Sequence, residues 1–212
     1  MASITQQTHE LLASRVRGQL AIDATAGNGY DTEFLARLVG PAGTVWAFDI
    51  QAQALQRTAA RLRESQITVE LRLRDVPAEL SLANTQSQVV CIEADHAEMN
   101  SHLPPGVRGQ IAAIMFNLGY LPGADQSCIT RTSSTLAALN AAWEWLASGG
   151  VLTVVAYPGH PGGEEEANAV RDWFVTQEQA GLGELLREIS PVTNTGPQLW
   201  ALLRGGKVPR TA

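Results

Sequence analysis

Lysine is almost absent from this chain, and cysteine, histidine and long apolar runs are scarce. Of the 15 basic residues all but Lys207 are arginine, and 21 acidic residues bring the net charge to −6. Non-specific binding to long nucleic acids needs a basic surface, so this charge argues against DNA binding. A local patch of arginines, whose planar side chains suit phosphate, could still hold a short RNA loop.

Metal, membrane and export signals are also missing. The two cysteines, Cys91 and Cys128, lack metal-site spacing, and the four histidines do not cluster along the sequence, so no metal is expected. The longest apolar runs, 111–116 and 151–156, are too short to span a bilayer. Because the first ten residues are polar, we expect no signal peptide, no membrane partner and a cytoplasmic location.

The remaining pattern is that of one α/β domain. The 212 residues, 45% of them hydrophobic, suit a single domain, with an N-terminal helix within residues 1–18 and a flexible tail at 205–212. Short apolar runs predict strands at 19–24, 44–50, 89–93, 111–116, 151–157, 187–190 and 199–203, with an extra strand possible at 69–73. Helical spacing lies between them, at 5–17, 30–39, 51–64, 96–103, 133–146 and 164–180. This alternation predicts a Rossmann-like, mostly parallel sheet with helices on both faces.

Polar or glycine-rich segments follow five of the predicted strands. Ligands of such sheets bind at the carboxyl ends of the strands, near the switch in strand order. The five segments therefore share one rim of the sheet; they are 23–31, 49–51, 95–96, 117–120 and 157–163.

The first of these segments favours a cationic cofactor over a dinucleotide. A dinucleotide fingerprint needs a third glycine where this chain has Thr32, which disfavours a pyrophosphate site. A glycine-containing loop that opens with an acid suits S-adenosylmethionine, whose amino and sulfonium groups are cationic. The alternative is an ordinary strand–helix turn. The candidate cofactor residues here are Asp23, Thr25, Gly27, Asn28, Gly29, Asp31 and Thr32.

Two further acids suit the adenosine part of the cofactor. Asp49 lies 20 residues beyond Gly29, the spacing expected of a carboxylate that holds a ribose diol, although an aspartate that ends a strand can simply cap it. Gln51 follows it. Asp95, with His96 beside it, suits the exocyclic amine of adenine, and its alternative role is to N-cap the next helix.

The segment Asn117-Leu-Gly119-Tyr120 suits methyl transfer to nitrogen. In-line attack needs acceptors that hold an amine with its lone pair aimed at the methyl group, and an asparagine oxygen can do this. The aromatic face of Tyr120 can stack on a base or stabilise positive charge. The alternative is a turn that needs only Asn and Gly. The substrate side of the rim would include Pro122, Asp125, Tyr157 and His160, the last able to relay a proton near neutral pH.

Four strings together resemble the MnmM/YtqB methyltransferases, often labelled rRNA methylases. They are Asp23-Ala-Thr-Ala-Gly-Asn-Gly, Phe48-Asp-Ile-Gln51, Met115-Phe-Asn-Leu-Gly-Tyr-Leu-Pro-Gly123 and Tyr157-Pro-Gly-His-Pro-Gly-Gly163, within a resemblance that covers residues 8 to 204. The resemblance implies a class I methyltransferase fold with a seven-stranded sheet and a homodimer. It implies methyl transfer from S-adenosylmethionine, leaving S-adenosylhomocysteine, to the wobble uridine in a tRNA anticodon loop. There 5-aminomethyl-2-thiouridine becomes 5-methylaminomethyl-2-thiouridine.

The resemblance also implies roles for single residues. Those implied to contact the cofactor are Asp23, Asn28, Asp31, Asp49, Gln51, Asp95, His96 and Asn117, with Gly119 next to the last. Those implied on the catalytic and substrate side are Tyr120, Asp125, Tyr157 and His160. Gln126 stands where the family usually has lysine, and residues 67–88 look longer than usual. With the acidic charge, the missing lysine keeps open methylation of rRNA or a small amine; a non-catalytic module that binds the cofactor is the third alternative.

Overall fold

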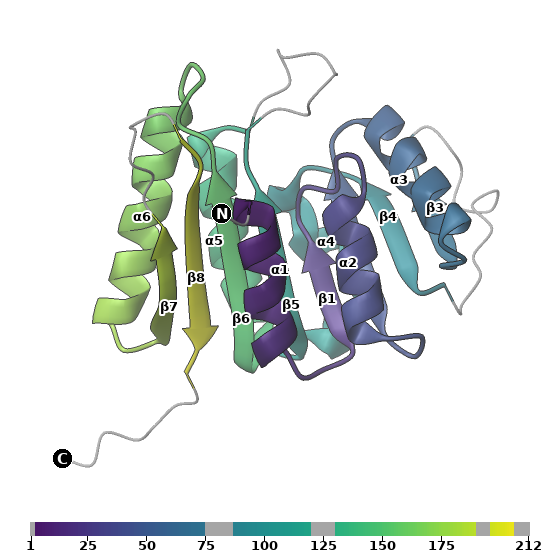
Figure 1. Ribbon diagram of the computed structural model, residues 1–212, viewed down its shortest axis with the longest axis horizontal. Coiled ribbons are helices and arrows are strands. Elements are labelled where there is room, and N and C mark those ends of the chain that lie inside the picture. Colours follow the sequence, from purple (N-terminus) through teal and green to yellow (C-terminus); the bar gives the residue numbers. More distant parts are fainter. Residues whose placement is uncertain (1–2, 75–86, 120–129, 190–195, 206–212) are drawn as a thin grey trace.

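One eight-stranded sheet organises the chain (Figure 1). The computed structural model describes residues 3–74, 87–119, 130–189 and 196–205. The strand order is β3-β4-β2-β1-β5-β6-β8-β7, so the expected count of seven strands is wrong by one. The additional strand is β3 (Val69–Arg72), which pairs in parallel with β4 at the edge of the sheet, in the segment where an extra strand was possible.

The strands are parallel except at the end of the sheet formed by the C-terminal part of the chain. There β8 runs antiparallel to both of its neighbours, β6 and β7. The other bounds are β1 Leu20–Asp23, β2 Thr44–Asp49, β4 Val89–Glu93, β5 Ile111–Asn117, β6 Leu146–Ala156, β7 Gly183–Ile189 and β8 Gln198–Arg204. The predicted α/β class with a mostly parallel sheet is confirmed.

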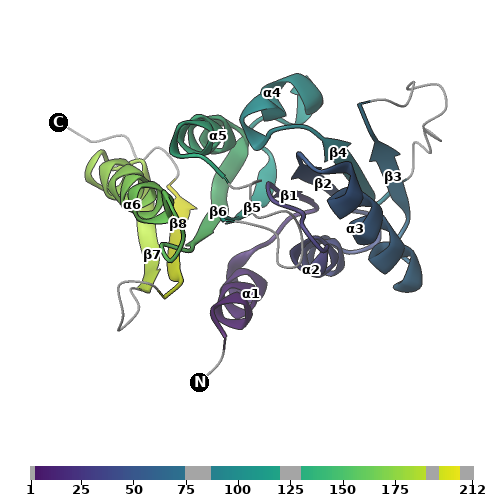
Figure 2. The same cartoon turned by 90° about the horizontal axis from the view of Figure 1, so that it is seen from above.

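Helices cover both faces of the sheet (Figure 2). The first three pack on one face and the last three on the other, with two short 3-10 turns at His96–Glu98 and Pro105–Val107. Their bounds are α1 Ile4–Arg15, α2 Tyr30–Val39, α3 Ala52–Glu64, α4 Met99–His102, α5 Thr132–Trp145 and α6 Gly163–Gln179. The N-terminal helix expected within residues 1–18 is α1; of the tail expected at 205–212, residues 206–212 lie outside the described residues.

Two apolar layers hold these helices to the sheet. Side chains alternate along each strand, so in β1 Ala21 faces α1–α3 while Ile22 faces α4–α6. Both faces are therefore covered, which explains why the strand sequences read as continuous apolar runs. The layer beneath α4–α6 contains the largest buried side chains, including Trp145 and Trp200.

The order of the strands reverses around β1. From β1 the chain moves outward through β2 and later returns to place β5 on the other side of β1. Such a reversal leaves a crevice at the carboxyl ends of the two central strands. The loops that follow β1 and β5 begin at this crevice.

Two strands begin earlier than the sequence suggested. A helix was expected at 133–146 and the next strand only from residue 151, but α5 ends at Trp145 and β6 already begins at Leu146. The pairing with β5 shifts register between Ile111 and Ala113, so the extra residues of β6 lie in this irregularity. Edge strand β7 likewise starts at Gly183 rather than residue 187.

Candidate active site

A cavity of about 820 Å³ opens at the carboxyl ends of the central strands. Loops that follow β1, β2, β4, β5 and β6 contribute to its wall, as the sequence predicted. Among the described residues, the predicted site residues that line it are Thr25, Gly27, Asn28, Asp31, Asp49, Gln51, Asp95, His96, Asn117, Gly119, Tyr157 and His160. Tyr120, Pro122 and Asp125 lie outside the described residues.

Asp23, Gly29 and Thr32 support the first loop from behind instead of lining the cavity. The buried Asp23 carboxylate accepts hydrogen bonds from the Thr32 hydroxyl at 2.6 Å and from the Thr25 amide at 3.1 Å. Burial and, secondarily, the negative charge of Asp31 raise the pKa of Asp23 to about 7. Direct cofactor contacts for these three residues stay a prediction.

Packing against α3 explains the second glycine of the loop. Gly29 has a φ of 81°, and a Cβ atom there would lie 2.9 Å from the Thr58 Cα. The Thr58 hydroxyl also donates to the Gly27 carbonyl at 3.1 Å, and Arg61 donates to the Asn28 carbonyl at 2.9 Å. Helix α3 therefore fixes the path of the loop along the cavity.

Asp49 ties the end of β2 to the same loop. One carboxylate oxygen accepts from the Gly27 amide at 2.9 Å and the other from the Gln51 amide at 2.8 Å. Burial raises the pKa of Asp49, while these two backbone donors act in the opposite direction. Each oxygen keeps a second lone pair, so the carboxylate can still accept from two hydroxyl groups of a ligand.

Asp95 and His96 form a second group of acceptors. Asp95 accepts from the Ala97 amide at 2.9 Å and so caps a 3-10 turn, and it also lines the cavity; the N-cap alternative and the ligand role are thus compatible. His96 Nδ1 lies 3.2 Å from the Ala24 carbonyl oxygen, which requires the proton on Nδ1. Burial lowers the pKa of His96, and its Nε2 atom lies 3.7 Å from Asp95 Oδ1 with no hydrogen-bond partner among the described residues.

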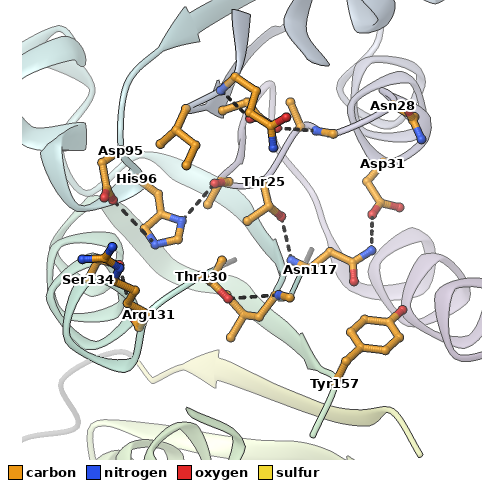
Figure 3. Close-up of a pocket in the computed structure, with 18 of the residues that line it drawn as sticks. Thr25, Asn28, Asp31, Asp95, His96, Asn117, Thr130, Arg131, Ser134 and Tyr157 are labelled. Carbon is orange, nitrogen blue, oxygen red and sulfur yellow. Dashed lines mark hydrogen bonds and ion pairs between the residues drawn. The ribbon is translucent and has the colours of Figure 1, made fainter. Parts of the chain in front are cut away.

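Asn117 lies where β5 ends, and its position is fixed by two contacts (Figure 3). Its backbone amide donates to the Thr25 hydroxyl at 2.7 Å, and its side-chain Nδ2 lies 3.3 Å from Asp31 Oδ2. An ionised carboxylate only accepts, so it must face the NH2 of the Asn117 amide. The carbonyl oxygen of that amide is then left for a ligand.

The opposite Asp31 oxygen pairs with a residue that the sequence analysis did not consider. His9 of α1 lies 2.7 Å from Asp31 Oδ1 through its Nε2 atom. No spacing signal could have joined two residues on different helices, 22 positions apart. The N-terminal helix therefore contributes to the site.

A buried acid holds the backbone next to Asn117. Gly119 exchanges two hydrogen bonds with Thr130: its amide donates to the Thr130 hydroxyl at 3.0 Å and its carbonyl accepts from the Thr130 amide at 3.2 Å. That hydroxyl in turn donates to Glu166 at 2.7 Å, and Thr135 donates to the other Glu166 oxygen at 2.6 Å. Glu166, in the first turn of α6, is only 3% exposed and was not among the predicted site residues.

Tyr157 and His160 complete the wall after β6. The Tyr157 hydroxyl points toward Asn117 and Asp31 in Figure 3. Burial raises the pKa of Tyr157, so the hydroxyl stays protonated at neutral pH and can donate a hydrogen bond. His160 Nδ1 lies 3.1 Å from the Pro161 carbonyl oxygen, and its ring packs closely against Gly163.

Other polar residues line the same cavity without having been predicted. They are Tyr30, Thr130, Arg131, Ser133 and Ser134, the last four at and before the start of α5. Within the described ranges no cluster of three metal-ligating side chains occurs. None of the described helices is long and apolar enough to cross a membrane.

Comparisons with known proteins fit this geometry. Residues 45–200 match the family model described as "Putative rRNA methylase". The chain is 34% identical over 190 residues to the Arabidopsis thaliana protein "tRNA (mnm(5)s(2)U34)-methyltransferase, chloroplastic"; the match covers 83% of this chain and 62% of the plant protein's length.

Two solved structures are similar to this chain in both fold and sequence. A "putative rRNA-methylase" from Clostridium thermocellum superposes with a TM-score of 0.79 at 32% identity, covering 96% of this chain and 98% of that one. A methyltransferase from Streptococcus mutans in complex with SAH gives a TM-score of 0.74 at 30% identity, with 96% and 99% covered. The fold predicted from the sequence, that of class I methyltransferases, is confirmed.

Proposed function

The chain belongs to the "Putative rRNA methylase" family, and we propose that it is an S-adenosylmethionine-dependent N-methyltransferase that acts on the tRNA wobble uridine. The product there would be 5-methylaminomethyl-2-thiouridine. The name of the Arabidopsis relative, which describes a methyltransferase of the same wobble uridine, supports this substrate. Because this chain spans 62% of that relative, the activity, substrate and partners of the whole protein are part of the proposal.

The acceptors of the cavity fit the adenosine part of the cofactor. Asp49 would accept from the ribose hydroxyls, since both of its oxygens keep a lone pair after their backbone contacts. Asp95 and the buried Nε2 of His96, which lies 3.7 Å from Asp95 Oδ1, would accept from the adenine amine. A volume of about 820 Å³ is in the usual range for small-molecule sites. When bound, the cofactor supplies an electrophilic methyl group on sulfur.

The position of Asn117 is the observation that carries the proposal. Figure 3 shows Asp95 and His96 on one side of the cavity and Asn117, Asp31 and Tyr157 on the other. Because Asp31 faces the Asn117 NH2 group, the Asn117 oxygen is oriented to accept from an amine N–H. An amine held in this way can direct its lone pair toward the methyl group.

The direct test uses tRNA that carries 5-aminomethyl-2-thiouridine. The purified protein and S-adenosylmethionine should convert this nucleoside to its methylated form, identified by nucleoside mass spectrometry. Asn117→Ala should abolish turnover and leave the affinity for S-adenosylhomocysteine within about threefold, because the backbone amide contact with Thr25 remains. Activity that survives in Asn117→Ala would contradict the assignment.

The alternative substrates give different results in the same assay. Methylation of rRNA or of a small amine, with none in tRNA, would exclude the wobble uridine, and cofactor binding without product would indicate a non-catalytic module. Binding to tRNA should weaken steeply as salt rises, whereas binding of a small amine should respond much less. The homodimer and the cytoplasmic location stay predictions, and we propose them with the tRNA substrate.

A further inference from the structure

His9 and Asp31 form a well-anchored pair at the edge of the cavity. His9 Nε2 and Asp31 Oδ1 are 2.7 Å apart, and their side chains are 24% and 12% exposed. The His9 ring also stacks on Phe34, with the ring centroids 3.8 Å apart and the planes within 3°. Two independent contacts therefore fix the histidine that α1 brings to α2.

The other oxygen of Asp31 faces the position proposed for the substrate amine. Asp31 Oδ2 lies 3.3 Å from Asn117 Nδ2, and both residues line the cavity. The Tyr157 hydroxyl points to the same place in Figure 3. An amine that hydrogen-bonds to the Asn117 oxygen would thus lie beside a carboxylate.

The proposed substrate must lose a proton before it can react. A primary alkylamine has a lysine-like pKa near ~10, so only about one molecule in a thousand is neutral at pH 7. The protonated form has no lone pair on nitrogen. An enzyme that binds the abundant ammonium form therefore needs a group that removes one proton.

Three other titratable groups that line the described cavity, Tyr157, Asp95 and His96, are unsuited to this task, whereas His160 is the competing acceptor, against which the Asp31 variant below discriminates. Tyr157 stays protonated at neutral pH because burial raises its pKa. Asp23, which does not line the cavity, is covered by its contacts with Thr32 and Thr25. Asp95 and His96 lie on the opposite side in Figure 3.

We propose that Asp31 is the catalytic proton acceptor for the substrate ammonium group and that His9 is the positioning residue that holds it. This inference rests on the proposed function. An N–H bond of the ammonium breaks, its proton passes to the Asp31 carboxylate, and the electron pair stays on nitrogen. The nitrogen then forms the bond to the methyl carbon while the carbon–sulfur bond breaks and sulfur keeps that pair. The net charge of the His9–Asp31 pair rises by one.

Titratable groups from three elements surround Asp31. The described titratable groups against it are His9 from α1, Asp23 from β1 and Tyr157 after β6. Glu33, on the same helix, is directed to Arg37 and Ser65 instead.

The pH dependence of the wild-type reaction tests the inference without any variant. With saturating cofactor, kcat/KM for aminomethyl-bearing tRNA should change less than about threefold between pH 7 and pH 9, because the enzyme uses the ammonium form. If the enzyme instead selects the free amine, kcat/KM rises about tenfold per pH unit in this range. That rise would overturn the inference and leave the proposed function intact. No product in tRNA at any pH would overturn both.

Asp31→Asn should change the nearly flat pH dependence of kcat/KM into one that rises with pH. Loss of the acceptor should lower kcat/KM by about 10²- to 10⁴-fold at pH 7. Activity should then recover about tenfold per pH unit, since the variant must use free amine. Affinity for S-adenosylhomocysteine should stay within about threefold; a larger loss would assign Asp31 to the cofactor, the role that the resemblance implies, and would overturn the inference.

Substitutions of His9 separate positioning from packing. His9→Phe keeps a ring to stack on Phe34 but removes the donor to Asp31, so kcat should fall while the melting temperature changes little. His9→Gln restores an N–H near the position of Nε2 and should recover most of kcat. Equal losses in both variants, in step with their melting temperatures, would contradict a positioning role.

Proton counting gives a readout that does not depend on turnover. Binding of the aminomethyl-bearing tRNA to the protein with S-adenosylhomocysteine is measured by calorimetry at pH 7 in two buffers of different ionisation enthalpy. The wild-type complex should release no proton to buffer, because the proton stays between substrate and Asp31. Release of one proton per tRNA would show selection of the free amine and would overturn the inference.

Discussion

Replacement of Glu166 by glutamine should weaken both the fold and the active site. Glu166, in the first turn of α6, accepts from the Thr130 and Thr135 hydroxyls at 2.7 and 2.6 Å. A glutamine has one acceptor oxygen where the carboxylate has two, so one hydroxyl faces an NH2 group instead. The Thr130 hydroxyl also accepts a hydrogen bond from the Gly119 amide, so the disturbance reaches the backbone two residues after Asn117.

The size of the effect follows from one lost charge-assisted hydrogen bond. A buried bond of this kind is worth about 1.5–3 kcal/mol. For a chain of this length about 1 kcal/mol lowers the melting temperature by 2–4 °C. Glu166→Gln should thus lower it by about 3–12 °C. In addition, kcat should fall while the affinity for S-adenosylhomocysteine changes little, because the acceptors Asp49 and Asp95 are not in this chain of contacts.

Glu164→Gln is the matched control. Glu164 is exposed in the same helical turn, so both variants lose the same favourable interaction with the helix dipole. The measurement is thermal unfolding of both variants and the wild type, followed by kcat and calorimetry. Equal melting temperatures for the two variants would refute the assignment of Glu166 as a structural anchor.

Three further predictions follow from the first loop and its support. Asp49→Asn should raise the Kd for S-adenosylhomocysteine about 10- to 150-fold, measured by calorimetry. Asp172→Asn, at an exposed position, is the control. A change below twofold in Asp49→Asn would contradict the role of Asp49 in binding the ribose. Gly29→Ala should lower the melting temperature more than Gly40→Ala. Both glycines have a positive φ, but only at Gly29 would the added Cβ atom lie 2.9 Å from the Thr58 Cα. Equal losses would contradict this steric explanation. Because the pKa of Asp23 is raised to about 7, its contribution to stability is present below pH 4 and is lost as pH rises through 7. The difference in melting temperature, Asp23→Asn minus wild type, should therefore be larger at pH 8 than at pH 5. A difference that does not change with pH would contradict the raised pKa of Asp23.

The rim of the site was predictable because its signal is local. Each polar segment directly follows an apolar strand, and parallel strands bring their carboxyl ends to one edge. Asp49 and Asn117 could thus be placed in one cavity without knowledge of any long-range contact. The additional strand β3 was harder to predict, because a four-residue strand at an edge has only a short apolar pattern.

Contacts between helices could not be predicted from the sequence pattern. His9 meets Asp31 only because α1 and α2 pack on the same face of the sheet. Glu166 did have a usable signal: it is four residues before Val170 and next to Ala167, on the buried face of α6. Three consecutive glutamates look equivalent in composition, and only the helical period separates the buried one from the exposed pair.

Binding of S-adenosylhomocysteine to the purified wild-type protein tests the central claim most directly. The claim is that loops at the carboxyl ends of the strands form a site for the methyl donor. Isothermal titration calorimetry should show one product molecule bound per chain, with S-adenosylmethionine competing for the same site. A folded protein that gives no binding of either molecule would contradict the account.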